Sequence, residues 1–335
     1  MLTAPAASDV APSPVALLTR GDAPHSDRAV RTGQLVTVMR GVYADGAAWR
    51  MLKPWEKYLA RVHAAALRYP DAAFCYESGA ALRGLTVFLE PADVHVVLPS
   101  TATSRVISGV RAHTAARMPA VAEVGGLVVA TPAEIVIDIA RARHNAIGLA
   151  VAGSALRADR HLTSQELAEL NATRLSARGR RHARWVLDRA TSTPESPLEY
   201  VSFAAIEWLG FPAPALQKWI RGAPGEDADR LDFWWEPWRI GGEADGEIKY
   251  SGELGDARSA MRERSLRDAR LLDRRCSHGS LGLARGDRSQ AVAGRVAGRW
   301  PACRAPRGQS PTPLAAARSH ASHCETAIAH RDCSR

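Results

Sequence analysis

The chain of 335 residues has room for two ordinary domains, and its 46% hydrophobic and 24% charged residues are typical of a globular rather than a disordered protein. No run of about 18 apolar residues occurs and the N-terminus lacks a secretory layout, which argues against a membrane partner and predicts a cytoplasmic protein. The net charge of +9 favours a polyanionic partner, although residues 276–335 carry +6 of it.

Residues 1–14 are rich in Ala, Pro and Ser and are predicted to be a disordered lead-in. The segment 15–50 predicts a winged helix-turn-helix. A first helix is expected after residue 15, followed by a short second helix from Ser26 to Arg31 that Gly33 ends. Two strands, Leu35 to Met39 and Val42-Tyr43, would then form the wing. In this layout the second helix can lie in the major groove of DNA.

Residues 51–190 predict an α/β region. Apolar residues recur at helical spacing between Trp55 and Leu67, and a short helix is expected from Glu77 to Leu85. Strands are predicted at 93–99 and 125–131, with a helix from Pro132 to 142. Residues 145–190 are predicted to be helical, with a capping-box start at Thr163 to Glu166. A linker is expected over 191–197.

Four motifs in this first part occur in a characteristic order. They are GQLVTVMRGVY, ESGAALRGL at 77–85, DVHVVLP at 93–99 and LVVATPAEIVIDIAR at 127–141. In order and spacing they resemble AbiEi-type antitoxins and related transcriptional regulators. The resemblance implies binding of double-stranded DNA, with Arg28 and Arg31 on the second helix and Arg40 at the wing as phosphate or base contacts. It also implies a cognate toxin and a homodimer as further partners. The alternative for these arginines is a solvated helix face.

The second domain is predicted over 198–275. Its first helix begins with Ser196 as N-cap, Pro197 at the first helical position and Glu199 three residues after the cap. Glu199 is therefore either a capping-box residue or a catalytic one. Strands are expected at 217–221, 231–235 and 238–250, followed by a helix at 258–272.

Acidic side chains gather on the predicted strand 238–250. If this strand stays extended, one face carries Glu243, Asp245, Glu247 and Lys249, near Asp232 on the preceding strand. Crowded carboxylates favour a divalent cation, and hard oxygen ligands suit Mg²⁺ or Mn²⁺. The alternative is a solvent-facing acidic hairpin. We expect Trp234, Trp235 and Trp238 to pack in or at the rim of the sheet rather than to stack on bases.

The spacing of these acids resembles Vsr-like nuclease domains of the PD-(D/E)xK class. The matching segments are SPLE at 196–199, Asp232-Phe233, and Glu243-Ala244-Asp245-Gly246. The resemblance implies a restriction-endonuclease-like mixed sheet flanked by helices. It also implies Asp232 and Glu243 as chief metal ligands, with Asp245 and Glu199 supporting. Lys249 is the candidate catalytic lysine, in the alternative frame Glu247-x-Lys249.

The composition changes abruptly near residue 272. Residues 276–335 lack Phe, Tyr, Lys, Met and Asn and show no helical or alternating pattern. We therefore predict a disordered tail and hypothesise that a frameshift replaced the end of the nuclease-like domain, leaving it truncated. A zinc-binding tail is the rival hypothesis, although the Cys and His spacing fits no familiar tetrahedral pairing.

Together these observations predict an α/β (α+β) protein that binds DNA and carries a metal-dependent endonuclease-like domain. The alternative is a non-enzymatic transcriptional repressor or antitoxin with a degenerate nuclease domain. A protein-interaction scaffold is a third hypothesis, which failure to bind DNA at low salt would favour.

Overall fold

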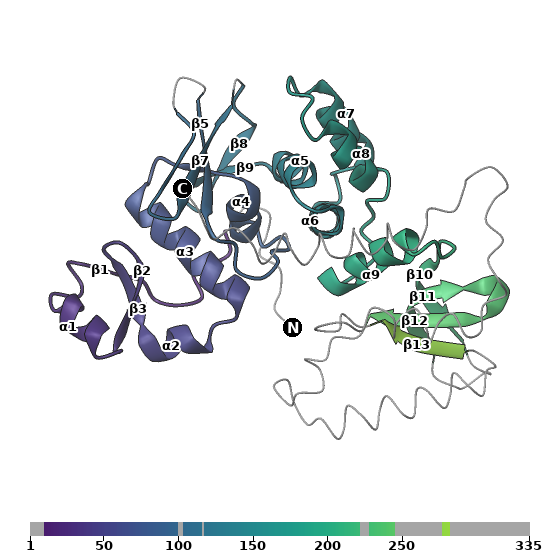
Figure 1. The fold of residues 1–335 in the computed structure, drawn as a ribbon, viewed down its shortest axis with the longest axis horizontal. Helices are drawn as coiled ribbons and strands as arrows, with labels where there is room; N and C mark the ends of the chain where they lie inside the picture. The colour runs from purple at the N-terminus through teal and green to yellow at the C-terminus, as the bar shows by residue number, and fades with distance from the viewer. Residues whose placement is uncertain (1–9, 100–102, 116, 222–227, 245–276, 282–335) are drawn as a thin grey trace, which may run out of the picture. The chain divides into compact units, whose positions relative to one another are not determined.

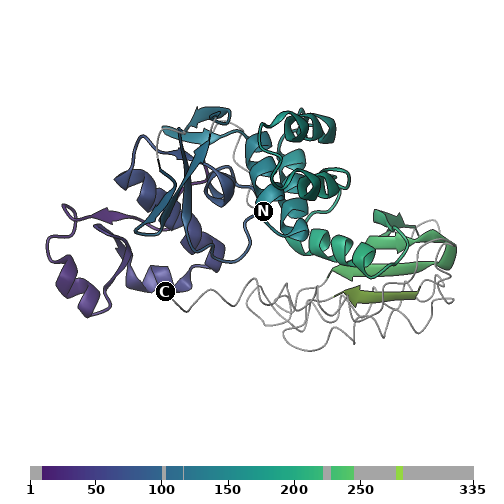
Figure 2. The same ribbon diagram turned by 45° about the horizontal axis from the view of Figure 1, so that its top comes forward.

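The computed structural model describes residues 10–99, 103–115, 117–221, 228–244 and 277–281, which form a mixed α+β protein with several sheets. The chain divides into two compact units, Met1–Trp238 and Arg239–Arg335. Figure 1 shows the elements of each unit with their labels, and Figure 2 shows the same ribbon turned by 45°.

The first unit begins with a small sheet in the order β1-β3-β2, built from β1 (Leu18–Thr19), β2 (Leu35–Met39) and β3 (Val42–Asp45). Between β1 and β2 lies the short helix α1 (Ser26–Arg31), as the sequence predicts. The earlier helix expected after residue 15 is wrong, because the described residues 10–25 contain no helix and residues 18–19 form β1. Pairing of Leu18 with Tyr43 and of Thr19 with Val42 supplies their backbone partners across the sheet.

Helix α2 (Gly46–Met51) follows β3 without a loop. The Asp45 side chain accepts a hydrogen bond of 2.8 Å from the Ala48 amide, which caps the helix. At Gly46 an added Cβ would lie 2.3 Å from the Gly33 carbonyl oxygen, so only glycine fits at this junction. The small sheet, α1 and α2 form one module within residues 10–53, which we call the N-terminal module. The predicted disordered lead-in 1–14 is wrong for residues 10–14, because the Ala11 amide donates a hydrogen bond of 2.7 Å to the Leu82 carbonyl oxygen.

The central sheet has six strands in the order β6-β7-β5-β4-β9-β8. It is mixed, because β5 runs parallel to β7 and β4 parallel to β9, whereas the other neighbouring strands are antiparallel. Its strands are β4 (Ala73–Phe74), β5 (Val94–Pro99), β6 (Arg105–Ile107), β7 (Val110–Ala115), β8 (Val121–Val124) and β9 (Leu127–Ala130). The predicted strands at 93–99 and 125–131 are thus confirmed as β5 and β9.

Helices pack on this sheet and against one another. Helix α3 (Pro54–Arg68) begins with Pro54 and with a hydrogen bond of 2.7 Å from the Lys53 amide to Glu56. The others in this part are α4 (Tyr76–Leu82), α5 (Pro132–Ala142), α6 (Asn145–Ala158), α7 (Ser164–Thr173) and α8 (Arg180–Leu187). Helices α5 to α8 form a bundle beside the sheet (Figures 1 and 2). The predicted capping box of Thr163 and Glu166 is confirmed at α7.

Helix α9 (Pro197–Trp208) packs on α6, where the Tyr200 ring fills the space beside Gly153. The core of the first unit is therefore continuous from the central sheet through α6 to α9. After α9 come two antiparallel strands, β10 (Ala215–Ile220) and β11 (Asp229–Trp235), and a short 3₁₀ turn at Glu236–Trp238.

The second unit is described in β12 (Ile240–Ala244) and β13 (Ser277–Leu281), which pair in parallel from Ile240↔Ser277 to Ala244↔Leu281. The prediction that the whole segment 276–335 is disordered is therefore wrong for residues 277–281. A parallel ladder is held by backbone hydrogen bonds, and it does not require the alternation of side chains on which that prediction rested.

Candidate nucleic-acid interface and carboxylate site

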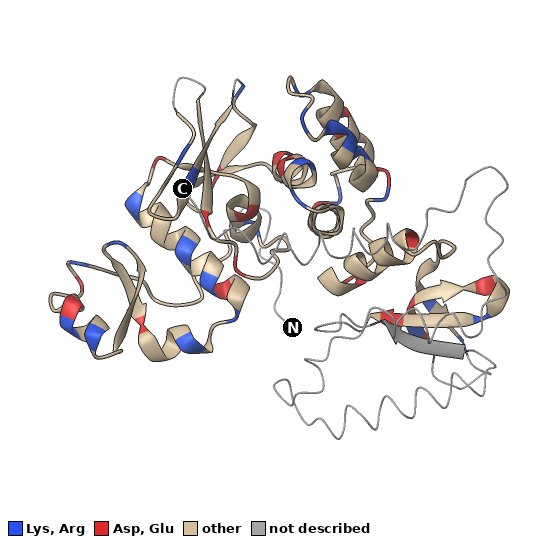
Figure 3. Ribbon diagram, in the orientation of Figure 1, with Lys and Arg blue, Asp and Glu red and all other residues tan. Residues whose placement is uncertain are grey.

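The N-terminal module presents its three predicted arginines to solvent. Helix α1 buries Ser26 and exposes Arg28 and Arg31, which are three positions apart and therefore lie on one face. Arg40 is exposed at the two-residue turn between β2 and β3, where Gly41 has a φ of 81°. In Figure 3 the ribbon of α1 is blue at its basic residues and red at its acidic residue.

The N-terminal module carries more basic than acidic residues. Residues 10–53 contain six Lys and Arg residues against three Asp. Within the described part of the chain, none of Arg28, Arg31 and Arg40 forms an ion pair. Asp45 is occupied by the cap of α2, and Asp22 accepts hydrogen bonds from Thr19. These hydrogen bonds lower the pKa of the Asp22 carboxyl.

A second site lies where α9 meets β10 and β11. Gln217 on β10 donates from Nε2 to Glu199 Oε2 at 2.7 Å and to Asp232 Oδ1 at 3.0 Å. The register on both sides of this position, Leu216↔Phe233 and Lys218↔Leu231, places Gln217 opposite Asp232. One amide group thus holds together two of the predicted site residues. We call Glu199, Gln217 and Asp232 the carboxylate site.

The structure places Glu199 at the start of α9, where its side chain also bonds to Gln217. Ser196 Oγ accepts a hydrogen bond of 3.3 Å from the Glu199 amide, so the predicted N-cap of α9 is confirmed. The Glu199 carboxylate does not return its bond to Ser196, however, and accepts instead from the Glu195 amide at 2.8 Å. The same oxygen faces Gln217, and the side chain is buried, so Glu199 belongs to the carboxylate site as well as to the helix start.

Gln217 has two features that sequence patterns do not reveal. Its backbone has a φ of 52°, a left-handed conformation that costs a non-glycine residue about 1 kcal/mol or more. Its Oε1 atom is buried without a hydrogen-bond partner among the described residues, although Nε2 has two. A polar strand residue in a strained conformation beside two carboxylates is unusual for a residue whose only task is packing.

The predicted metal ligands are partly brought together. Among the described residues, no group of three or more His, Cys, Asp or Glu side chains is placed to hold a metal ion. Glu199 and Asp232 converge on Gln217 Nε2, and their two carboxylates offer hard oxygen donors. Such a set suits a hydrated Mg²⁺ or Mn²⁺, because Mg²⁺ is usually bound by one or two carboxylates and several waters.

The remaining predicted residues lie elsewhere in the chain. Glu243 is on β12 in the second unit, so a shared site with Asp232 stays a prediction. Asp245 and Lys249 lie outside the described residues, as do Glu247 and the predicted helix at 258–272. Trp234 and Trp235 are buried, which confirms that they are packing residues, whereas Trp238 is 37% exposed.

A partly buried polar cluster lies beside the central sheet, and no sequence motif predicted it. His95 on β5 has its Nδ1 2.8 Å from Nε2 of His113 on β7, and its own Nε2 lies 3.5 Å from Glu77 Oε2. Arg143 donates to both oxygens of Glu77, from Nη2 at 3.0 Å. The Tyr76 ring stacks on His113 at 4.3 Å between centroids. We call these five residues the histidine cluster. A histidine within a run of valines in DVHVVLP was the available signal.

Burial and charge shift the titration of this cluster. Burial lowers the pKa of His95 to about 4, and burial also lowers the pKa of His113, with Arg111 and Arg143 adding to the effect. Burial opposes ionisation of Glu77, but the hydrogen bonds and charge of Arg143 hold its pKa below the ordinary value. The cluster is therefore built around neutral histidines and a buried ion pair.

Comparisons with family models, with curated proteins and with solved structures found no match to this chain. No helix in the described ranges has the length and apolar character that crossing a membrane would require.

Proposed function

We propose that the protein binds double-stranded DNA through its N-terminal module, in the manner of an AbiEi-type transcriptional regulator with a winged helix. The observation that carries the proposal is the exposure of Arg28, Arg31 and Arg40 on one short helix and one hairpin turn, without ion pairs among the described residues. Arginines in this arrangement can contact phosphates and guanine edges in the major groove.

Two parts of a winged helix are present in this module, the helix α1 and the β2–β3 hairpin, whereas the described residues before α1 contain no first helix. The α1 helix would enter the groove and the β2–β3 turn would contact the backbone. The strand β1 takes the place in the chain where a supporting helix was expected. A cognate toxin and a homodimer belong to the same proposal, since both follow from the AbiEi resemblance.

The test is fluorescence anisotropy of labelled duplex DNA with the full chain at a series of salt concentrations. Arg28→Ala, Arg31→Ala and Arg40→Ala should each weaken binding, and each should reduce the slope of log K against log salt by about 1. The exposed Arg160 outside the module supplies the control, and Arg160→Ala should change neither quantity. Binding that all four variants share with the native chain would contradict the proposal, and no binding at low salt would favour a protein-interaction scaffold.

The carboxylate site favours a second function, metal-dependent phosphodiester hydrolysis by a Vsr-like domain. Its specific support is the convergence of Glu199 and Asp232 on Gln217. A bound Mg²⁺ or Mn²⁺ would activate water and stabilise charge on the phosphate. Glu199 and Asp232 would hold the ion, Glu243 and Asp245 would complete the ligands, and Lys249 would be the catalytic lysine.

Cleavage of plasmid and mismatched duplex DNA in Mg²⁺ and in Mn²⁺ separates the two functions. The combined variant Asp232→Ala, Glu243→Ala should abolish cleavage and leave DNA binding intact. If the native chain binds DNA and cleaves none in either metal, the non-enzymatic regulator with a degenerate nuclease domain is the function that remains.

A further inference from the structure

A strongly basic segment joins helices α7 and α8. Residues 174–184, RLSARGRRHAR, contain five arginines, and no Asp or Glu lies between Glu169 and Asp188. The segment follows the end of α7 at Thr173 and continues into α8, which begins at Arg180. In Figure 3, which has the orientation of Figure 1, the ribbon of α8 is blue at its arginines. We call residues 174–184 the α7–α8 basic segment, and it lies outside the N-terminal module.

Helix α8 has a buried face and a basic face. Its buried residues are Ala183, Val186 and Leu187. Arg181 and Arg184 are exposed, and because they are three positions apart they lie on one face of the helix. Arg178, two residues before the helix, is exposed as well. The segment therefore presents three guanidinium groups to solvent.

Two side chains from neighbouring helices fix the loop that carries Arg178. Arg141 on α5 donates from Nη1 to the Ser176 carbonyl oxygen at 2.7 Å. Asn171 on α7, which is 2% exposed, donates from Nδ2 to the Arg180 carbonyl oxygen at 3.1 Å. These bonds hold the backbone on both sides of Arg178, so a partner that binds there has little of this loop to order.

The first arginine of the segment anchors it to α5. Arg174 donates to Glu134 and, at 2.8 Å, to Asp138, and both carboxylates are buried. Arg178 and Arg181, in contrast, form no ion pair within the part of the chain that the structure describes. The buried ion pairs thus position the segment and leave these two cations available.

No acid neutralises the start of α8. Arg180 and Arg181 lie in its first turn, which contains no acidic residue, and the N-cap Gly179 supplies no side-chain bond. Cations are unfavourable at this end of a helix, because the macrodipole places partial positive charge there. Burial lowers the pKa of Arg141, and the positive charges of Arg174 and Arg180 lower it further. The Nε atom of Arg180 is buried and has no acceptor among the described residues. Positive charge is therefore concentrated where a bound anion would be stabilised.

We propose that the α7–α8 basic segment is a second DNA-binding surface, which contacts the phosphate backbone of double-stranded DNA through Arg178 and Arg181. Guanidinium groups bind phosphate oxygens with paired, charge-assisted hydrogen bonds. Contacts of this kind raise affinity for any sequence and position the protein on the duplex. The inference rests on the proposed function, in which DNA is the partner, but it uses a different set of residues.

The composition of the segment favours a phosphate backbone over a protein partner. Leu175 is its only large apolar residue. The centre of a protein interface is apolar and depleted in charged residues, whereas a phosphate backbone is bound chiefly by cations. A rigid loop and helix start with several arginines and a single exposed leucine match the second case.

The test is fluorescence anisotropy of two labelled duplexes of unrelated sequence, titrated with the full chain at a series of salt concentrations. For the double variant Arg178→Gln, Arg181→Gln, affinity for both duplexes should fall about tenfold. The slope of log K against log salt should fall by about 2, one for each lost phosphate contact. An equal effect on both duplexes is expected because a phosphate contact does not read the bases.

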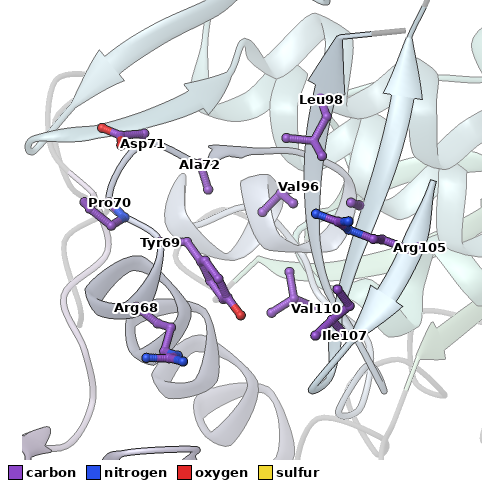
Figure 4. A pocket seen from close by; sticks show the side chains of 11 residues that line it. Arg68, Tyr69, Pro70, Asp71, Ala72, Val96, Leu98, Arg105, Ile107 and Val110 are labelled. Atoms are coloured by element: carbon purple, nitrogen blue, oxygen red, sulfur yellow. The ribbon is translucent and has the colours of Figure 1, made fainter. Parts of the chain in front are cut away.

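A matched control removes the same charge elsewhere. Arg68 and Arg105 are exposed and lie beside a cavity of about 430 Å³ on the six-stranded sheet (Figure 4). The double variant Arg68→Gln, Arg105→Gln should change neither the affinity nor the slope. An equal loss in this control would overturn the proposal, since net charge alone would then account for the effect.

A variant that gains affinity separates the proposal from simple misfolding. The exposed Asp188 pairs with Arg184 at 3.0 Å. Asp188→Asn frees this arginine on the basic face of α8, so affinity for both duplexes should rise about threefold. Asp71→Asn removes a carboxylate from an exposed loop and should leave the affinity unchanged. Circular dichroism spectra check that all of these surface variants fold.

The variants also distinguish failure of this inference from failure of the proposed function. If Arg28→Ala, Arg31→Ala and Arg40→Ala weaken binding but Arg178→Gln, Arg181→Gln does not, the basic segment is a solvated face and the inference is overturned. If only the second set weakens binding, the inference stands and the N-terminal module does not bind DNA. No binding by the native chain at low salt would overturn both.

Discussion

His95 Nδ1 lies 2.8 Å from His113 Nε2, and the two rings stack with 5.1 Å between their centroids. In such a bond one ring nitrogen must donate and the other must accept, so the two histidines cannot both be cations while it is made. The groups that face them are Glu77 and Tyr76 from α4, Arg143 at the end of α5, and Asp93 and Arg111 from the sheet strands and their ends. Both histidines therefore bind a proton only at a lower pH than a histidine in water.

The first prediction concerns the pH dependence of stability. Burial lowers the pKa of His95 to about 4 from its ordinary value of 6.5. Between pH 6.5 and pH 4, His95 therefore binds a proton in the unfolded chain but stays neutral in the folded chain. The contribution of His95 to the free energy of unfolding is fully present above pH 6.5. It should be lost as the pH drops toward 4, which lowers the free energy of unfolding by up to ~3 kcal/mol. Thermal unfolding at a series of pH values measures the loss.

The control for this prediction is the variant His95→Gln, which keeps a polar side chain but does not titrate. Burial raises the pKa of Asp138 to about 6, and this group stabilises the fold as pH falls, in the opposite sense to His95. The informative quantity is therefore the difference between the native chain and the variant. A difference that is independent of pH between 4 and 6.5 would rule out the buried neutral histidine.

The second prediction concerns the ion pair of Glu77 and Arg143. Arg143→Met should lower the free energy of unfolding by about 2–3 kcal/mol, because it leaves a buried carboxylate without its main partner. Adding Glu77→Gln should recover part of the loss. The exposed pair of Arg184 and Asp188, at 3.0 Å, is the matched control, and Arg184→Met should cost about 0.5 kcal/mol or less. Equal losses at the two sites, measured by urea unfolding, would show that burial adds nothing.

The third prediction concerns Gln217. Gln217→Leu removes the amide that bridges Glu199 and Asp232, and should cost about 1–3 kcal/mol. Millimolar Mn²⁺ should restore part of the melting temperature, since a cation can replace the lost donor between the carboxylates. Gln165→Leu is the control, because that amide donates to a single exposed carboxylate, Glu169, at 2.9 Å. If Mn²⁺ affects both variants alike, the carboxylate site does not bind it.

The fourth prediction concerns the contact between α6 and α9. An added Cβ at Gly153 would lie 2.1 Å from the Tyr200 ring, so Gly153→Ala should lose about 2–3 kcal/mol despite the better helix propensity of alanine. Gly148→Ala on the same helix meets its nearest atoms at 3.1 Å and should lose less. Combining Gly153→Ala with Tyr200→Leu should restore much of the loss in urea unfolding. An unchanged midpoint for Gly153→Ala would mean that the two helices are not packed this closely.

Sequence patterns predicted the elements whose side chains repeat regularly. Helix α3, helix α5 with Pro132 in its first turn and the capped start of α7 all lie where periodicity and capping residues placed them. For residues 15–20 the sequence pattern predicted a helix, whereas Leu18 and Thr19 form a strand. Their apolar run VALL is equally compatible with a short strand, and pairing with β3 decides between helix and strand.

The candidate site was predicted only in part, because its geometry depends on residues distant in sequence. Glu199 and Asp232 were identified as acids, but nothing in their spacing shows that Gln217 holds both. Likewise, His95 and His113 meet only because β5 and β7 pair in parallel with β6 outside them. The pairing and register of the strands place such groups together. The alternation within one strand shows which of its faces is buried, but it does not show which strand lies beside it.

The packing of Tyr200 against Gly153 also determines where the chain can be divided into fragments that fold. The sequence suggests a boundary at 191–197, yet Tyr200, Ala204 and Ile206 of the next helix are buried. A fragment beginning at residue 191 would expose this apolar stripe to water and, we expect, precipitate or aggregate. For the same reason a protease that nicks the loop before α9 should leave the two pieces associated through gel filtration.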